Sequence, residues 1–164
     1  MDFITQLPLS GSFDSILVVV DRFSKMAIFI PTDSTITALD LAQLFISHLF
    51  SKHGLPISIV SDRGSLFVSL FWTQLCHQLK ISRDLSTAFH PETDRKPERV
   101  NQILDQYLWM YFSYNQDDWH TWLPLAEFTY NNVEHSSTKQ SPFFTIYGRN
   151  PSFDSIQISR DCEP

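Results

Sequence analysis

The first third of the chain alternates short apolar runs with turn-forming residues. One run spans 16–20 and is closed by Asp21, and a second spans 26–30 and is followed by Pro31. Because only a short connection separates the two runs, we expect them to pair as an antiparallel hairpin. Proline has no backbone N–H, so we expect the second strand to stop at Pro31.

Helical periodicity replaces this pattern after position 37. Apolar residues recur at steps of three and four from Leu41 to Leu49. Thr37 is suited to cap the N-terminus of this helix, and Gly54 is suited to end it.

A strand–helix–strand unit follows. The apolar run 57–60, closed by Asp62, predicts the first strand. Apolar residues at 71, 75, 76 and 79 predict the helix, and 81–85 the second strand. This order implies parallel pairing through a right-handed crossover.

The second half of the chain looks mainly helical. Residues 86–96 show neither the periodicity of a strand nor that of a helix, which predicts a loop. Pro97 fits the first turn of a helix, so Glu98 is expected at a helix start. Segments 119–130 and 143–147 look helical and rich in aromatic residues. Together these elements predict an α/β layered fold of the ribonuclease H kind, with a mixed five-stranded sheet flanked by helices.

Three acidic residues lie at the ends of predicted elements. Asp21 and Asp62 close strands, and Glu98 begins a helix. Carboxylate oxygens that converge in this way suit Mg²⁺ or Mn²⁺, and paired ions of this kind catalyse attack on phosphodiesters. Taken singly, each acid has a plainer interpretation, as the end of a strand or as a charge that favours the positive end of a helix.

Composition limits the class of protein. The 164 residues, 43% hydrophobic and 14% aromatic, suffice for one globular domain and argue against disorder. No apolar run approaches the roughly 20 residues that span a bilayer, and the first residues do not resemble a secretory signal. We therefore expect an intracellular protein with no membrane partner.

The net charge of −6 is unusual for a protein that binds nucleic acid, because phosphate binding calls for basic surface. Basic residues are nevertheless concentrated, since five of the twelve fall within twenty positions: Lys80, Arg83, Arg95, Lys96 and Arg99. Bound metal would offset the acidic residues of a metal site. The alternative is an ordinary solvated surface, which the net charge alone favours.

Cysteine and histidine give no sign of a zinc site. Cys76 and Cys162 lie far apart, and the six histidines show no zinc-binding spacing. Cys76 falls within an apolar helical pattern and is expected to be a small core residue.

Five stretches, in this order, resemble the catalytic core of integrases from long-terminal-repeat retrotransposons of the Ty3/gypsy type, relatives of retroviral integrase. They are residues 1–4 with 16–29, 61–67, 87–94, 98–101, and 135–138 with 141–143 and 147–148. The resemblance predicts that 1–151 form the integrase catalytic core and that 152–164 form a C-terminal linker or tail.

The resemblance implies a ribonuclease H-like fold and a catalytic triad of Asp21, Asp62 and Glu98 that binds two Mg²⁺ (or Mn²⁺) ions. One ion would activate water or a DNA 3′-hydroxyl, and the other would stabilise the leaving oxygen. The implied activity is that of a polynucleotidyl transferase that processes DNA 3′ ends and joins them to target DNA.

The resemblance also implies contacts with DNA. Phe89 and His90 match the loop beside the DNA end, where Phe89 either stacks on a base or is buried. Asn101 lies on the same helix face as Glu98 and is expected to orient the loop or the carboxylate. Arg99 is a candidate phosphate contact. Weaker candidates are Lys25, Arg63 and Lys96, and Arg95 adds to the positive charge of the loop.

One departure from the family lies directly before Glu98. Family members usually have Gly-Gln-Thr where this chain has Arg95-Lys96-Pro97. The substitution removes backbone freedom from a loop that is expected to move. The added positive charges would strengthen contact with DNA, or alternatively the loop would no longer close properly. We expect the metal ligands to survive this change, and the rate of strand transfer to be the property in question.

Integration needs two active sites held together, so the resemblance implies a homo-oligomer that acts in the nucleus. Four aromatic residues could form its interface or belong to the core: Trp109, Phe112, Trp119 and Trp122. Two other functions stay open, a retroelement-derived protein that binds DNA or protein without catalysis, and a nuclease for RNA–DNA hybrids.

Overall fold

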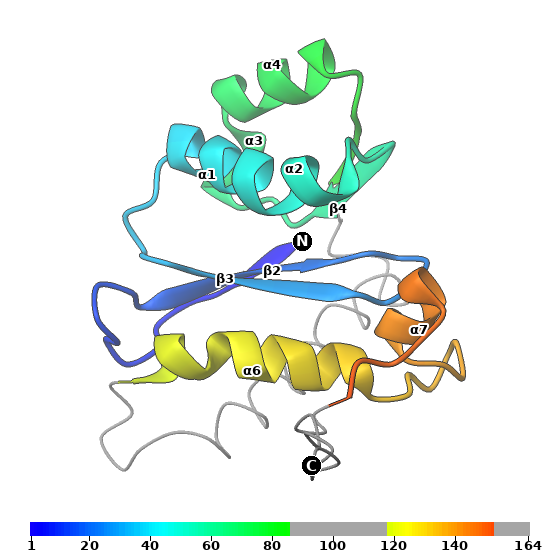
Figure 1. Ribbon diagram of the computed structural model, residues 1–164. Coiled ribbons are helices and arrows are strands. Elements are labelled where there is room, and N and C mark those ends of the chain that lie inside the picture. The colour runs from blue at the N-terminus through cyan, green and yellow to red at the C-terminus, as the bar shows by residue number, and fades with distance from the viewer. Residues whose placement is uncertain (86–117, 153–164) are drawn as a thin grey trace, which may run out of the picture.

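The computed structural model describes residues 1–85 and 118–152. The predicted loop 86–96, the helix that begins near Glu98, and the tail lie outside the described residues. Helices cover both faces of a central antiparallel sheet (Figure 1). Among residues 1–85 and 118–152, every helix is too short or too polar to be a candidate bilayer span.

The central sheet contains the predicted hairpin. Its strand order is β1 (Asp2–Ile4), β2 (Ser15–Val20), β3 (Ala27–Thr32), and all neighbours are antiparallel. The predicted end of the second strand was wrong, because Pro31 lies within β3, opposite Ile16. Since β3 is an edge strand, a residue whose nitrogen faces away from β2 needs no N–H there.

The predicted helix after Thr37 is confirmed, including its cap. The Thr37 hydroxyl accepts the Asp40 N–H at 3.2 Å, and the Asp40 carboxylate accepts the Thr37 N–H at 3.0 Å. This reciprocal pair satisfies donors that the first helical turn leaves open. The helical segment ends at Gly54, whose φ of 78° suits glycine. It comprises α1 (Ala38–Leu44), the π-helical η1 (Phe45–Phe50) and α2 (Ser51–His53).

The predicted strand–helix–strand unit is also confirmed. It comprises β4 (Ser58–Ser61), α3 (Ser65–Val68), α4 (Leu70–Gln78) and β5 (Ser82–Leu85), and β4 pairs with β5 in parallel. The buried face of α4 carries Trp72 and Cys76, whereas Phe71 is 44% exposed. Cys76 is therefore a core residue, as expected.

Helix α6 (Trp119–Asn132) packs on one face of the central sheet, and α7 (Pro142–Tyr147) follows it (Figure 1). Two side chains of α6, one turn apart, bind the outer edge of β3. The Asn131 amide accepts the Ala27 N–H at 2.9 Å and donates to the Ala27 carbonyl at 2.8 Å. The Glu127 carboxylate accepts the Phe29 N–H at 2.8 Å. The polar backbone of β3 is thus satisfied by a helix.

Two hydrophobic clusters lie on opposite faces of the sheet. The α6 cluster contains Trp119, fully buried, together with Ile16, Val18 and Phe29. Trp119 is therefore core, whereas Trp122 is 40% exposed. Trp109 and Phe112 lie outside the described residues.

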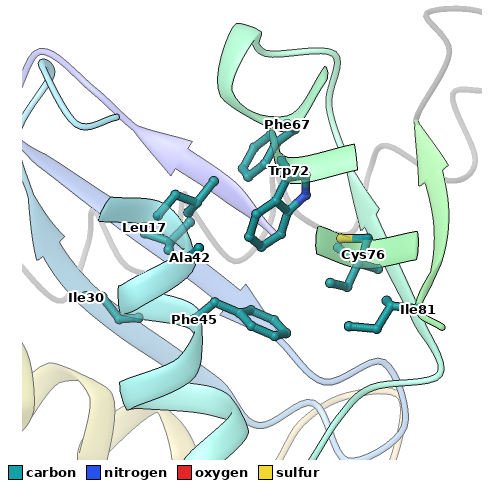
Figure 2. Close-up of a cluster of buried hydrophobic side chains, with 10 residues drawn as sticks. Leu17, Ile30, Ala42, Phe45, Phe67, Trp72, Cys76 and Ile81 are labelled. Atoms are coloured by element: carbon teal, nitrogen blue, oxygen red, sulfur yellow. The ribbon is translucent and has the colours of Figure 1, made fainter. Parts of the chain in front are cut away.

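The second cluster, called here the Trp72 cluster, lies on the other face (Figure 2). Leu17 and Ile30 of the central sheet meet Ile59 of β4 and Ile81, which directly precedes β5, around Trp72. Apolar burial of this kind is the main stabilising contribution to a fold. The Trp72 cluster therefore packs the β4–β5 pair against the central sheet.

Candidate functional site

Asp62 directly follows β4, as the sequence predicts. Its Oδ1 accepts the Gly64 N–H at 3.0 Å. A Cβ atom on Gly64 would lie 3.0 Å from Oδ1 and 3.4 Å from Oδ2 of Asp62. Glycine therefore allows the backbone to approach the carboxylate closely, while the side chain of Asp62 stays exposed.

Asp21 directly follows β2, but its carboxylate binds the hairpin turn. Its Oδ2 accepts the backbone N–H of Ser24 at 2.8 Å and the Ser24 hydroxyl at 2.6 Å. Partial burial acts to raise the pKa of Asp21, but hydrogen bonds from Ser24 and Phe23 and the charge of Lys25 outweigh it and lower the pKa. The contacts of Asp21 are those expected of a residue that organises a turn.

Strand β1 lies between the ends of β2 and β4. Asp2 is opposite Val18 in the register with β2, and the Met1 nitrogen donates to the Val60 carbonyl at 2.6 Å. Because β2 runs antiparallel to β1, Asp21 lies beyond the Met1 end of β1, whereas the chain after Val60 runs toward Phe3, on which Phe67 stacks. Asp21 and Asp62 therefore lie in opposite directions from Met1 along β1.

Asp2 was not among the acidic residues selected because they follow an apolar run. It lies on β1, next to β4, and is therefore nearer to Asp62 than Asp21 is. Burial lowers the pKa of the Met1 amino group, and the charges of Asp2 and Asp62 both act to raise it. Both carboxylates thus act on the same nitrogen, which belongs to the residue directly before β1.

Side-chain alternation places Asp2 and Asp62 on the same face. Phe3 stacks on Phe67 at 5.4 Å in the Trp72 cluster, so Asp2, its neighbour in β1, faces the opposite side. Ile59 also belongs to the Trp72 cluster, and continued alternation beyond β4 directs Asp62 to that opposite side as well. The same rule directs Asp21 toward the side of Leu17.

The signal that could have found Asp2 is in the sequence. Residues 1–4 are one of the stretches that carry the family resemblance, and Asp2 is the acidic residue within it. The apolar-run criterion missed it because β1 has only three residues and no apolar run precedes the aspartate.

Most of the other predicted site residues lie outside the described ranges: Glu98, Phe89, His90, Arg95, Lys96, Arg99 and Asn101. Within residues 1–85 and 118–152, no group of three His, Cys, Asp or Glu side chains could hold a metal ion. A site at Asp62 thus requires a ligand from elsewhere, and Glu98 is the predicted one.

The basic residues in the described ranges differ in their hydrogen bonds and in their exposure to solvent. Arg83 donates to the Thr73 hydroxyl at 2.6 Å and to the Phe67 carbonyl at 2.5 Å. It therefore connects β5 to the α3–α4 segment. Arg63 follows Asp62 and is exposed, and the Lys25 ammonium donates to the Arg22 carbonyl.

The sequence of this chain is similar to parts of known transposon polyproteins. The chain is 34% identical over 158 residues to the Tf2-3 and Tf2-4 transposon polyproteins of Schizosaccharomyces pombe. The match covers 96% of this chain and only 12% of the length of each polyprotein.

Solved structures match across most of the chain. A simian T-cell lymphotropic virus intasome in complex with the PP2A regulatory subunit B56 gamma matches with TM-score 0.74 and 20% identity, over 98% of this chain and 57% of the other. The catalytic core domain of BIV integrase gives TM-score 0.66 and 20% identity, over 89% and 92%. The HTLV-2 integrase catalytic core domain in complex with magnesium gives 0.65 and 19%, over 87% and 90%.

These structural matches confirm the ribonuclease H-like α/β fold, and the five described strands fit the expected mixed topology. The model of the family described as "Integrase core domain" matches residues 1–91. The expected resemblance to Ty3/gypsy-type elements is confirmed by the Tf2 relatives. With more than half of its length matched by that model, the chain belongs to the integrase core domain family.

Proposed function

We propose that the chain is the catalytic core of an integrase, a metal-dependent polynucleotidyl transferase that processes DNA 3′ ends and transfers them to target DNA. The observation that supports this most directly is the exposed Asp62 at the end of β4, with Asp2 on the same face of the neighbouring strand. As a working boundary, the core comprises residues 1–151, followed by a tail at 152–164.

The metal ligands of the proposed site are Asp62, Glu98 and one further aspartate. Hard carboxylate oxygens fit Mg²⁺ or Mn²⁺, and the HTLV-2 core that this chain resembles was solved with magnesium. The sequence pattern favours Asp21 as the third ligand. The strand order and the side-chain alternation favour Asp2, because the carboxylate of Asp21 is bound to Ser24.

Two bound ions would supply Lewis-acid activation of the attacking oxygen and stabilisation of the leaving oxygen. The chain itself orients a carboxylate that would bind these ions. Gly64 fixes the Asp62 carboxylate through its N–H, which lowers the entropy lost when that side chain is ordered. A water molecule or a DNA 3′-hydroxyl would be the nucleophile, so no covalent intermediate with the protein is required.

The experiment is a disintegration assay on a branched DNA in Mg²⁺ or Mn²⁺, with the single variants Asp2→Asn, Asp21→Asn, Asp62→Asn and Glu98→Gln. Asp33→Asn serves as a charge-matched control. We expect Asp2→Asn, Asp62→Asn and Glu98→Gln to lose at least about a hundredfold in rate, since each removes a charged ligand.

The two aspartate candidates give opposite results in this assay. If Asp2 is the ligand, Asp21→Asn keeps most of the activity and loses stability in the hairpin. If Asp21 is the ligand, Asp21→Asn is inactive while Asp2→Asn is active. Activity that persists in Asp62→Asn contradicts the proposed site altogether.

A second candidate function is DNA or protein binding without catalysis, which the Arg95-Lys96-Pro97 departure favours. Wild-type protein that binds DNA but shows no metal-dependent cleavage would identify it. Restoring Gly-Gln-Thr at 95–97 then tests whether the loop alone limits strand transfer. An RNA–DNA hybrid substrate in the same assay tests the nuclease alternative.

The proposed activity has consequences for assembly and place of action. Matched structures include dimeric and trimeric forms of the HTLV-2 core and a viral intasome. We propose that this chain likewise forms a homo-oligomer on DNA, and that it acts in the nucleus, where target DNA is found.

A further inference from the structure

We propose that Asp84 is a further acidic residue of the candidate metal site, which raises the affinity for divalent cations through its charge without being a direct ligand. The proposal rests on the proposed function, because it takes the site at Asp62 as a metal site. Asp84 lies outside the predicted set of site residues, since it belongs to the interior of β5 and follows no apolar run.

The register of the parallel strands places Asp84 close to Asp62. Asp84 is the partner of Val60, and Asp62 lies two residues beyond Val60. With an inter-strand spacing of about 4.8 Å and a rise of about 3.3 Å per residue, the two aspartates are roughly 8 Å apart along a diagonal. Asp2 lies one strand further away, because the Met1 nitrogen binds the Val60 carbonyl from the other side of β4.

Side-chain alternation places Asp84 on the face of the sheet that carries Asp2 and Asp62. Ile81 belongs to the Trp72 cluster, and Arg83 points to that same side, where its guanidinium donates hydrogen bonds to α3 and α4. Asp84, the next residue, therefore faces the opposite side. Three adjacent strands thus present an aspartate on one face.

The charge of Asp84 has no counterpart in the part of the chain that the structure describes. Asp84 is exposed, and within residues 1–85 and 118–152 its carboxylate makes no hydrogen bond or ion pair. Aspartate is unfavourable inside a strand. On a face that is proposed to accept DNA phosphates, a negative charge is also unfavourable unless it favours a cation there.

The distance decides what this charge can do. Residues 1–85 and 118–152 contain no group of three acidic, His or Cys side chains that could hold a metal ion, so Asp84 does not complete the set of ligands. An ion between Asp2 and Asp62 would lie roughly 8–10 Å from the Asp84 carboxylate. At that distance, and at about 0.1 M salt, one negative charge changes the affinity for a divalent cation about threefold.

The test is the affinity for Mn²⁺, measured by isothermal titration calorimetry without DNA. We expect Asp84→Asn to weaken binding about threefold, and Asp84→Lys, which changes the charge twice as much, to weaken it about tenfold. Asp84→Glu keeps the charge and should bind like wild type. Glu134→Gln is the matched control, because it removes one negative charge at an exposed position just beyond α6, the helix that binds β3.

Salt separates an effect of charge from an effect of structure. At about 1 M salt the Debye length is about 3 Å, so the Asp84 variants should bind Mn²⁺ like wild type. A difference from wild type that stays the same at both salt concentrations overturns the inference, because a change in structure would not be screened.

Asp62→Asn in the same titration distinguishes this inference from the proposed function. Weaker binding in Asp62→Asn with unchanged binding in Asp84→Asn overturns the inference and leaves the metal site intact. Unchanged binding in Asp62→Asn contradicts the metal site and the inference together.

Two other outcomes would assign Asp84 a different role and so overturn the inference. A loss of Mn²⁺ affinity in Asp84→Asn of more than about a hundredfold would make Asp84 a direct ligand, since a charge at this distance cannot produce it. A change in DNA affinity in EDTA, with Mn²⁺ affinity unchanged, would assign the carboxylate to the control of DNA binding.

Discussion

Gly64 determines how the Asp62 carboxylate is held. A side chain at position 64 would meet both carboxylate oxygens at 3.0–3.4 Å, closer than ordinary van der Waals contact. Because α3 begins at the next residue, the backbone has little freedom to move away. The position of the carboxylate is therefore coupled to a residue that carries no side chain.

We expect Gly64→Ala to move the Asp62 carboxylate and to weaken Mn²⁺ affinity about threefold or more, as measured by isothermal titration calorimetry. Gly54→Ala is the control. An added Cβ at Gly54 meets nothing within 4 Å, but its φ of 78° makes the variant less stable. Equal metal affinity in Gly64→Ala and wild type would show that the carboxylate adapts.

Glu127 titrates in an unusual environment. Burial raises its pKa above the ordinary value of 4.5, while the Phe29 N–H and the charge of Lys52 act to lower it. A raised pKa means that the folded state prefers the protonated acid. The stability contributed by this preference is fully present below the unfolded pKa and is lost as the pH rises through the folded pKa.

Glu127→Gln should remove this pH dependence, because the amide oxygen still accepts the Phe29 N–H and carries no charge. The difference in unfolding free energy, variant minus wild type, should therefore increase from pH 4 to pH 8. Urea denaturation followed by circular dichroism at several pH values measures it. A difference that stays constant with pH would contradict the raised pKa.

The three aspartates show what the sequence could predict of the site. Asp62 was selected because an apolar run precedes it, and the structure places it at a strand end. Asp2, the alternative ligand proposed above, was not selected because that criterion needs a longer run than β1 provides. For Asp21 the run is real, but the sequence does not reveal that Ser24 binds its carboxylate.

Single elements were predicted best where local chemistry alone defines them. Thr37 and Asp40 form a cap that needs no tertiary contact, and the start of α1 agrees with the prediction. Pro31 was misjudged because its effect depends on whether its strand lies at an edge, which only the assembled sheet reveals. Trp72 is buried and Phe71 is exposed, which likewise depends on which face of α4 packs against the rest of the protein.

Helix α6 provides side-chain hydrogen-bond partners for the backbone of β3. Asn131 is 1% exposed and binds both polar backbone groups of Ala27. Asn131→Ala should lower the free energy of unfolding by about 2–4 kcal/mol, because two buried backbone groups lose their partner. Chemical denaturation measures this loss. Asn132→Ala, which removes one 3.2 Å bond to the Pro151 carbonyl, is the neighbouring control and should cost less.

At the scale of the whole molecule, the Trp72 cluster decides whether the two parts of the site stay together. Asp62 follows β4, whereas Asp2 and Asp21 belong to the central sheet. The cluster packs side chains from both sheets around Trp72. Loss of this packing would separate the aspartates even if each sheet kept its own hydrogen bonds.

Trp72→Ala should lower the free energy of unfolding by about 3–5 kcal/mol and weaken metal binding at the same time. Cys76 is buried in the same cluster, so the reactivity of its thiol measures how often the cluster becomes exposed to solvent. Burial raises the pKa of its thiol, although the charge of Arg83 opposes this, so the native thiol should react slowly.

In a Cys162→Ser background, labelling of Cys76 by a maleimide should accelerate in Trp72→Ala. Trp122→Ala, which truncates a residue that is 40% exposed on α6, should leave the labelling rate unchanged. Equal rates in the Trp72 and Trp122 variants would show that Trp72 does not hold the two parts together.

The bonds from α6 to β3 also limit how copies of this chain can join. Successive nitrogens on the free side of β3 belong to residues 27, 29 and 31; the first two are already bound by the helix, and the third is a proline nitrogen. An incoming peptide would find no free main-chain donor at these three residues, which disfavours extension of the sheet across subunits at this border. A second copy of the chain that joins at this border would therefore use side-chain contacts, which single substitutions can change without disturbing the sheet.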